Sequence, residues 1–566
     1  MKKFLLATAL FLFSTLFVFA QAPKKKPAAK QQQKTTLPKE SAPETKVQRV
    51  EIEPKHKSDE YNVAPVGDNG LILFNENRDN TSKGQREWIF TNYSKDFKEG
   101  WTKSVMMGKK MEFDKMFYDD KQEELFILMI DPFYGKGEMG RTVKGDFAIV
   151  NVKVKTGDVK VVPGRVPFNT SINDFKVMND HAYFGGGEIP TPMQANKRQC
   201  LVVCTCFLIN ISKSTPFKLA PTLVVVDVNS GTTSIAAMPY KGMSSVTSIS
   251  ANPDLKTTSA LVTNVPKKKE SNMYVREYDY SGNLSNTLQV QAQSDNNLLD
   301  GSITSFKEGD KLVIGTYAPN GKKISVMTPA AVGVYISHLN KDNSQSYIKY
   351  YPFTKFKNFF SYLGTQLQQK VNAKVSKKAS KGKEVNIYYN LLVHDIIKRG
   401  DNYLFIAEAY YRQYHYEYVY TGNGGYYKRV FDGFRYTHAV VAGFDQDGNL
   451  LWDNAFPIWD ILSMDLKERV KVLPRGEKVI LVYSTGGALE LKAIEGNTVS
   501  PYSVIPIETN YADDKVKANY GGDGQYWYDD YFITWGYQKI KNADNNEKDN
   551  VKNKRFVFYF NKVAFK

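Results

Sequence analysis

The chain has 566 residues, of which 42% are hydrophobic and 24% charged, with 76 Lys and Arg against 59 Asp and Glu. This composition excludes a disordered or collagen-like chain, and the length is sufficient for one large core or several smaller ones. The formal net charge of +17 would suit a nucleic-acid partner if it were spread over the fold. The distribution of the basic residues along the chain therefore decides whether such a partner is expected.

The first twenty residues have the three parts of a secretory signal peptide. Lys2 and Lys3 precede a mostly apolar run, and the small residues Val18 and Ala20 stand before Gln21. The run is shorter than the ~20 residues that a membrane span needs, which favours cleavage over a retained anchor. We therefore expect residues 1–20 to be a signal peptide and the protein to be exported, either to the periplasm or to the cell surface.

Most of the positive charge lies in two segments. Residues 21–57 contain mainly Lys, Pro, Ala, Gln and Thr, which predicts a disordered basic tether. This tether carries 10 Lys and Arg against 4 Asp and Glu, and residues 355–384 carry 8 against 1, so that the rest of the mature chain is nearly neutral. Nucleic acid is therefore not an expected partner, and an anionic membrane surface matches the two basic segments better.

From about Gly70 onward, short β-branched and aromatic runs alternate with polar turns. One unit recurs, in which an apolar run, an Asp or Asn, a Gly-containing turn and a second run follow one another. Its clearest copies occupy residues 147–158, 223–231, 274–283 and 439–452. This recurrence predicts an all-β fold, a seven- or eight-bladed β-propeller over residues 58–566, with segments 47–52 and 555–565 placed to close the ring. Two β-sandwiches in series are the alternative, but they would not need the same hairpin throughout.

One insertion interrupts the repeats. Phe356, Phe360 and further apolar residues of segment 353–369 stand at helical spacing, which predicts an amphipathic helix. A lysine-rich run that includes Lys377 and Lys378 follows it. This basic insertion (355–384) would suit contact with a membrane or a partner, whereas a helix that caps the propeller and a solvated loop is the simpler interpretation.

The most unusual local sequence is rich in tyrosine. Every second residue of one predicted strand is a tyrosine, which places four of them on one face: Tyr414, Tyr416, Tyr418 and Tyr420. A Gly-rich turn then brings the chain back toward residues 431–436, so the segment predicts a long hairpin. If it projects from the ring, its tyrosines would contact a protein or a sugar ring, but a strand packed inside a blade fits the alternation equally well.

No motif has the spacing of an established catalytic or metal site. The segment Gly135–Gly140 matches G-x-G-x-x-G, but a predicted strand follows it where a phosphate site needs a helix. Cys200, Cys204 and Cys206 fall on one face of a predicted strand with no histidine nearby, which favours buried thiols over a metal site. Four acids close in sequence are candidates for glycoside hydrolysis, with solvated surface charge as the simpler interpretation: Asp395, Glu408, Glu417 and Asp432. We assign no catalytic residue, metal or cofactor.

Three segments resemble exported propeller-like proteins of Bacteroidota-type bacteria: the leader end Phe19-Ala20-Gln21, the hairpin 443–452 and the run 403–411. Some proteins of such groups are accessory parts of outer-membrane export or uptake machines, so the resemblance implies a propeller with a role at the envelope. The leading hypothesis is a non-enzymatic binding or scaffolding propeller whose partner is an envelope protein or a glycan. A carbohydrate-active enzyme that acts on glycans is the alternative.

Overall fold

The computed structural model describes residues 48–564 except 135–140, 189–218, 237, 326–327, 383, 423, 477, 497, 512 and 543–551. The segment Gly135–Gly140 and the three cysteines Cys200, Cys204 and Cys206 therefore lie outside the described residues. So do the predicted signal peptide and most of the predicted tether.

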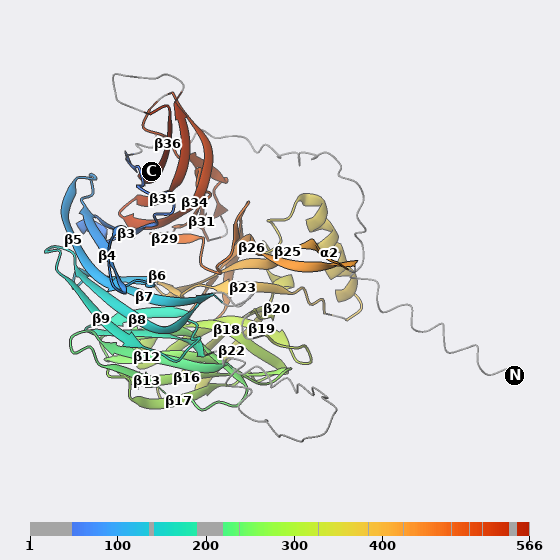
Figure 1. Cartoon of the computed structure of the whole chain (residues 1–566). Coiled ribbons are helices and arrows are strands. Elements are labelled where there is room, and N and C mark those ends of the chain that lie inside the picture. The colour runs from blue at the N-terminus through green and yellow to red at the C-terminus, as the bar shows by residue number, and fades with distance from the viewer. Residues whose placement is uncertain are drawn as a thin grey trace. The chain divides into compact units, whose positions relative to one another are not determined.

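In the described part of the chain the strands form eight sheets with antiparallel neighbours, and five of them are built from strands that follow one another in sequence (Figure 1). The first two consist of β2 (Tyr61–Pro65), β3 (Leu71–Ser82), β4 (Gln85–Tyr93) and β5 (Glu99–Gly108), and of β6 (Glu112–Asp119), β7 (Glu124–Tyr134), β8 (Arg141–Lys153) and β9 (Val159–Arg165). The next two consist of β10 (Asp174–Met178), β11 (His181–Glu188), β12 (Ala220–Asp227) and β13 (Thr233–Ala236), and of β14 (Met243–Asn252), β15 (Thr257–Lys267), β16 (Glu270–Asp279) and β17 (Leu284–Val290).

The fifth sheet contains β18 (Asn296–Ser305), β19 (Lys311–Pro319), β21 (Gly333–Leu339) and β22 (Gln345–Pro352). The sixth contains β20 (Ala330–Ala331), β23 (Tyr389–Val393), β24 (Ile397–Arg399), β25 (Asn402–Thr421), β26 (Gly424–Phe444), β27 (Leu450–Pro457) and β28 (Leu462–Ser463). The seventh contains β29 (Lys471–Arg475), β30 (Lys478–Ser484), β31 (Ala488–Glu495), β32 (Thr498–Val499) and β33 (Ser503–Pro506). The last contains β34 (Asp514–Tyr528), β35 (Tyr531–Asn542), β36 (Lys554–Ala564) and β1 (Gln48–Ile52).

These sheets form a β-propeller, as the recurring hairpin predicts. In the order given above, the first strand of each sheet, apart from the two-residue β20, is called its leading strand. Leading strands of neighbouring sheets contact one another: β6 contacts β10, β10 contacts β14, and β34 contacts β2. Bridges through Thr170 join the sheets β6–β9 and β10–β13. The ring has seven blades when these two sheets are counted as one and eight when each is counted, and both numbers lie in the predicted range.

The core lies between successive sheets because each strand sends alternate side chains to opposite neighbours. In β7, Leu125 and Ile127 pack in a cluster with the sheet β2–β5. Phe126 and Leu128, one position along, pack in a cluster with the sheet β10–β13. A strand buried on both faces reads as a continuous apolar run, which explains why the runs of this sequence do not alternate strictly.

An aspartate ends the second or third strand of several sheets and fixes the turn after it. Asp279 Oδ1 accepts the backbone N–H of Asn283 at 2.8 Å, and Asp445 Oδ1 accepts that of Asn449 at 2.7 Å. In the second turn Gly448 has a φ of 76°, a conformation that glycine adopts without strain. The recurring Asp and Gly of the sequence are therefore turn residues.

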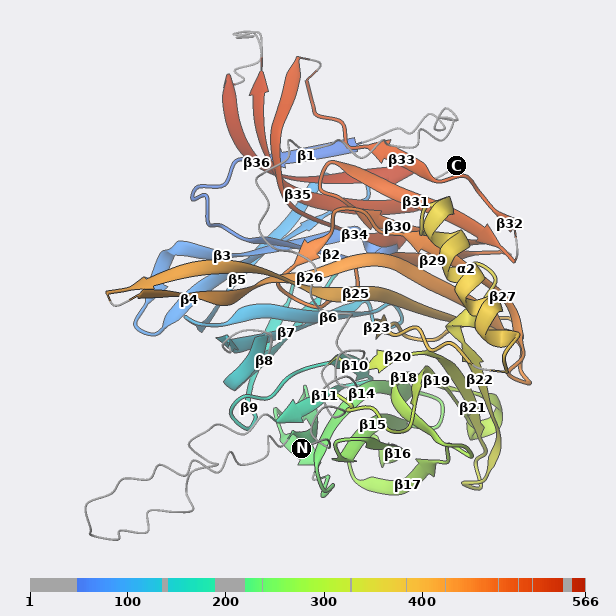
Figure 2. The ribbon, with the colours of Figure 1, turned by 90° about the vertical axis from the view of Figure 1, so that its right-hand side faces the viewer.

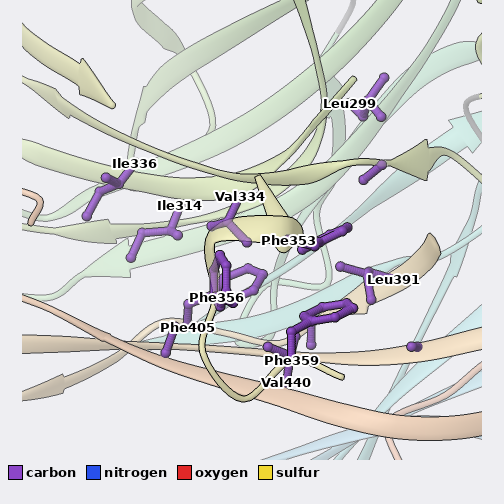
Figure 3. Close-up of a cluster of buried hydrophobic side chains, with 14 of the residues drawn as sticks. Leu299, Ile314, Val334, Ile336, Phe353, Phe356, Phe359, Leu391, Phe405 and Val440 are labelled. Carbon is purple, nitrogen blue, oxygen red and sulfur yellow. The ribbon is translucent and has the colours of Figure 1, made fainter. Parts of the chain in front are cut away.

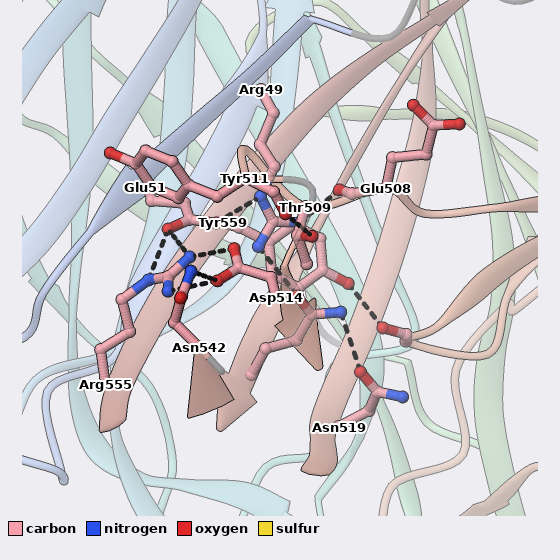
Figure 4. A network of polar contacts seen from close by, with 12 residues as sticks. Arg49, Glu51, Glu508, Thr509, Tyr511, Asp514, Asn519, Asn542, Arg555 and Tyr559 are labelled. Atoms are coloured by element: carbon pink, nitrogen blue, oxygen red, sulfur yellow. Dashed lines mark hydrogen bonds and ion pairs between the residues drawn. The ribbon is translucent and has the colours of Figure 1, made fainter. Parts of the chain in front are cut away.

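The ring is closed by β1, which pairs with β36 and completes the last sheet. Arg555 of β36 donates to Glu51 of β1 (Nε to Oε2, 3.0 Å) and to Asp514 of β34 (Nη1 to Oδ1, 2.8 Å), as Figure 4 shows. Arg49 adds a hydrogen bond to Glu51 at 2.8 Å. The propeller thus includes residues 48–52, as expected of the segment 47–52 placed to close the ring, and it begins before residue 58.

The helix predicted over residues 353–369 is wrong. Phe353–Lys355 forms a short 3-10 turn, η3, as do Gly67–Asn69 (η1) and Lys307–Gly309 (η2), and the α-helix α2 spans Thr365–Ala379. Phe356 and Phe360 are each 5% exposed, in a cluster between the fifth and sixth sheets (Figure 3). The spacing of the phenylalanines reflects a compact loop that fills this space, and the Gln-, Lys- and Ala-rich segment after Gly364 supplies the helix formers.

Candidate functional site

A cavity of about 660 Å³ lies at the centre of the ring. Its wall is formed by residues of seven leading strands: β6, β10, β14, β18, β23, β29 and β34. Charged side chains from several of these strands reach it, among them Lys115, Lys176, Asp300 and Lys471. The propeller therefore brings together in one cavity residues that lie up to several hundred positions apart in the sequence.

An ion pair crosses the cavity. Lys176 of β10 contacts Asp395, which follows β23, and Lys176 Nζ also lies 3.4 Å from Asp174 Oδ1. The Asp395 side chain is 59% exposed to the cavity space, yet the surrounding protein raises its pKa against the opposing effect of Lys176. The pair links the third and sixth sheets, which are not neighbours in the ring.

Glu468 is surrounded by positive charge in the same cavity. Burial alone would raise its pKa, but His394 and the lysines outweigh burial and lower it. The lysines that contribute are Lys471, Lys115 and Lys176. Glu468 is therefore ionised over the ordinary pH range, which makes it a poor general base and a good electrostatic partner for cations.

Behind the cavity wall, Glu408 holds His394 in place. Glu408 Oε1 lies 2.8 Å from His394 Nε2 and accepts the backbone N–H groups of Arg469 and Val470 at 2.8 and 2.9 Å. Burial opposes protonation of His394, but Glu468 and Glu408 together raise its pKa. Glu408 is fully buried and does not line the cavity, so it acts on the site through His394.

The predicted hairpin is present as β25 and β26, which Figure 2 shows in orange as the longest strands of the ring. Opposite residues of an antiparallel pair share a face, so the register adds three side chains to the tyrosine face: Phe431, Arg429 and Tyr427 lie opposite Tyr414, Tyr416 and Tyr418. Tyr418 and Tyr427 form an edge-to-face pair with ring centroids 5.2 Å apart. The other face carries charge, since Glu417 lies opposite Lys428.

The outer half of this hairpin projects from the ring. Tyr416, Tyr418 and Tyr420 are 66%, 57% and 74% exposed, whereas Tyr414 is partly covered and lies under Arg429. Among the described residues, β23 pairs with β25 only as far as Tyr410, and β28 pairs with β26 only from Phe434. Beyond these points the strand pairing among the described residues is that of β25 with β26.

The remaining predicted site residues lie elsewhere. Lys377 and Lys378 are in the last, exposed turn of α2, where their charge also suits the helix C-terminus. Phe356 and Phe360 are buried and offer no contact surface, which corrects their assignment as binding residues. No helix in the described part of the chain is long and apolar enough to cross a membrane.

The four acids considered for glycoside hydrolysis do not form one site. Asp395 lines the cavity, Glu408 is buried behind it, and His415 at the hairpin contacts both Glu417 and Asp432. Most of the cavity residues could not be predicted from the sequence, because the first strands that carry them are far apart in the chain. A charged residue within the first strand of several repeats, as in β6, β10, β18 and β29, was the signal that could have found some of them.

No family model matches the chain, and no curated protein matches it either. Among solved structures it is similar to a cobalt-substituted apocarotenoid oxygenase of Synechocystis (9% identity, TM-score 0.29), covering 50% of this chain and 59% of that one. It is also similar to Kuenenia stuttgartiensis hydrazine synthase (9%, TM-score 0.32, 65% and 73%) and to a polysaccharide lyase, an ulvan lyase (8%, TM-score 0.37, 77% and 89%). The chain thus spans less than two thirds of the oxygenase, and all three similarities are low.

Proposed function

We propose that the protein is an exported binding or scaffolding propeller of the bacterial envelope that docks a partner protein on the outer half of the β25–β26 hairpin. The observation that carries the proposal is the exposure of Tyr416, Tyr418 and Tyr420 on a projecting hairpin. A soluble fold rarely exposes several large aromatic residues side by side unless they are covered by a partner. Tyrosine is also enriched among the residues that contribute most to protein interfaces.

The open edges of the hairpin favour an extended segment of a protein as the partner. Beyond Tyr410 and Phe434, no other strand in the described part of the chain pairs with β25 or β26. Such edges bind an added strand through its main chain, while alternate side chains provide specificity. A partner strand could therefore pair with either edge while its side chains pack on the tyrosine face.

The location at the envelope rests on the sequence. The predicted signal peptide supports export, and the basic tether and the exposed lysines of α2, such as Lys377 and Lys378, support contact with an anionic membrane surface. The resemblance to exported propeller-like proteins of Bacteroidota-type bacteria supports the role of an accessory subunit in an outer-membrane machine.

Photo-crosslinking tests the docking surface. A photoreactive phenylalanine analogue at position 418 is expected to capture one envelope protein, and the same analogue at Tyr520 of β34, 49% exposed, serves as the control. The captured protein is then purified and its affinity measured for the wild type and for the triple variant Tyr416→Ala, Tyr418→Ala, Tyr420→Ala. A loss of about 2 kcal/mol or more is expected if the tyrosines are central to the interface. Equal affinities, or identical capture at both positions, would contradict the proposal.

A carbohydrate-active enzyme is the second candidate. It is favoured by the cavity, in which Asp395 and Glu468 accompany lysines and hydroxyl groups. The hydrolytic pair that the sequence indicated is not the basis for it, because of those four acids only Asp395 lines the cavity. Turnover on a glycan panel that disappears in Asp395→Asn but persists in the triple tyrosine variant would favour this candidate over the scaffold.

A further inference from the structure

The central cavity has a wall in which many hydrogen-bonding groups stand among apolar side chains. Hydroxyl side chains line it, including Ser171 before β10, Ser248 of β14 and Ser302 of β18, and the Ser248 and Ser302 hydroxyls lie 3.4 Å apart. Tyr410 and Phe434 add aromatic surface on the side of the sixth sheet. Small-molecule sites are usually lined mainly by apolar side chains, so this wall suits a ligand that carries many hydroxyl groups.

Asp300 is an acid of the cavity that is available to such a ligand. Asp300 of β18 accepts the backbone N–H of Gly301 at 2.8 Å, and no described Lys, Arg or His nitrogen lies within 4.0 Å of its carboxylate. Asp174 and Asp395, by contrast, both contact Lys176. Asp300 can therefore accept a hydrogen bond from a ligand hydroxyl without first breaking an ion pair.

Two cations of the cavity also lack a direct counter-ion. Neither Lys115 nor Lys471 has a described carboxylate within 4.0 Å, although Lys471 Nζ donates to the Glu468 carbonyl at 3.2 Å. Both line the cavity together with Glu468, and both lower the pKa of Glu468. An anionic group bound between them would make the direct contacts that Glu468 does not make.

From these features we infer that the central cavity binds an acidic sugar, a hydroxyl-rich ligand that carries a carboxylate or a sulfate. Lys115 and Lys471 bind its anionic group, and Asp300 accepts a ring hydroxyl. The volume of about 660 Å³ falls within the ~300–1,000 Å³ typical of small-molecule sites and accommodates a short oligosaccharide. The site is separate from the β25–β26 hairpin, and its ligand need not be the protein partner proposed there.

Calorimetric titration of the full chain tests this inference with four probes. A hyaluronan tetrasaccharide carries carboxylates, a carrageenan tetrasaccharide carries sulfates, cellotetraose is neutral, and an acidic tetrapeptide represents a different class. One or both acidic saccharides are expected to bind more tightly than cellotetraose, with an affinity that falls as salt is added. The preference between the two identifies the anionic group. Tighter binding of the peptide, or no binding of either acidic saccharide, would overturn the inference.

Charge-removing variants place the ligand. In Lys115→Gln, Lys471→Gln the affinity for the bound acidic saccharide is expected to fall about tenfold or more, because charge-assisted hydrogen bonds are lost. Lys103→Gln, on an exposed position of β5, is the matched control and should bind like the wild type. Asp300→Asn should weaken neutral and acidic saccharides alike. Unfolding curves check that each variant is folded, and the single variant Lys115→Gln replaces the double one if it is not. Undiminished affinity in the folded lysine variant would overturn the inference.

Discussion

The closing sheet (β34, β35, β36 and β1) and the outer half of the β25–β26 hairpin contain the same residue types in opposite environments. Both are antiparallel ribbons rich in tyrosine and in charged groups. In the closing sheet Asp514 and Arg555 are almost fully buried and paired with each other, and Tyr559 beneath Arg49 is fully buried. In the outer half of the hairpin the tyrosines are more than half exposed.

The difference follows from the number of neighbouring strands. Strand β36 pairs with β35 on one side and with β1 on the other, and side chains of an adjacent sheet pack against it. The outer hairpin has neither a third strand nor a covering sheet among the described residues. A lone two-stranded ribbon is only marginally stable. The closing sheet therefore contributes to the stability of the ring, whereas the hairpin contributes little and keeps its side chains available.

The largest effect is expected from removing the cation of the closing sheet. Arg555→Ala would leave Asp514 buried without its cation and would remove a bond to Glu51 of β1. Breaking a buried pair in this way costs about 3–5 kcal/mol. A shift of the urea unfolding midpoint measures the loss, and limited proteolysis after residue 47 reports whether β1 has detached.

The matched control is an exposed pair of the same kind. Arg475 and Asp530 lie 2.9 Å apart, with side chains that are about half exposed. Arg475→Ala should cost about 1 kcal/mol or less, because exposed ion pairs contribute little. If the two arginine variants were equally unstable, burial would not explain the role of the closing sheet.

Local patterns of the sequence predict most of this fold but not its core contacts. The Asp and Gly turns predict the hairpins, and the alternation at Tyr414 to Tyr420 predicts the long hairpin. Both predictions succeed because turns and strands depend on residues that are close in sequence. The helix predicted at Phe356 and Phe360 is wrong because their spacing fits a helix as well as a loop that is packed between two sheets. Only tertiary contacts decide between these two structures.

The cavity could not be predicted from the sequence for a similar reason. Lys176 and Asp395 meet across the ring, and no local rule relates residues so far apart. Lys115 and Lys471 each lie in the first strand of a sheet, but the strand sequence does not show that either side chain faces the centre of the ring. The hairpin, in contrast, is formed by one continuous segment, so its residues could be found together.

An intermediate effect is expected at Asp300, which compares the cavity with the closing sheet. Burial raises the pKa of Asp300 to about 6 and no cation offsets it, whereas Arg555 and Asn542 outweigh burial and lower the pKa of Asp514. A raised pKa means that the folded protein binds more protons than the unfolded chain between about pH 4 and 6. Stability should fall as the pH rises through that range.

Asp300→Asn removes this penalty without changing the size of the side chain. The variant should be more stable than the wild type by about 2–3 kcal/mol above pH 6, and the difference should vanish below about pH 4. Urea midpoints measured at several pH values check both parts. A variant that is less stable at every pH would mean that the carboxylate makes a stabilising contact, and that the contrast with Asp514 is wrong.

The smallest effect is expected at the hairpin. The triple variant Tyr416→Ala, Tyr418→Ala, Tyr420→Ala should change the global free energy of unfolding by about 1 kcal/mol or less, because exposed side chains contribute little and the outer ribbon can open locally. Tyr559→Ala is the matched change in the closing sheet and should cost about 3 kcal/mol or more, since it empties a buried site and removes a 2.7 Å hydrogen bond to the Gly486 carbonyl. If the triple tyrosine variant unfolded as readily as Tyr559→Ala, the tyrosines would stabilise the ring. Their exposure could then no longer be explained by a partner.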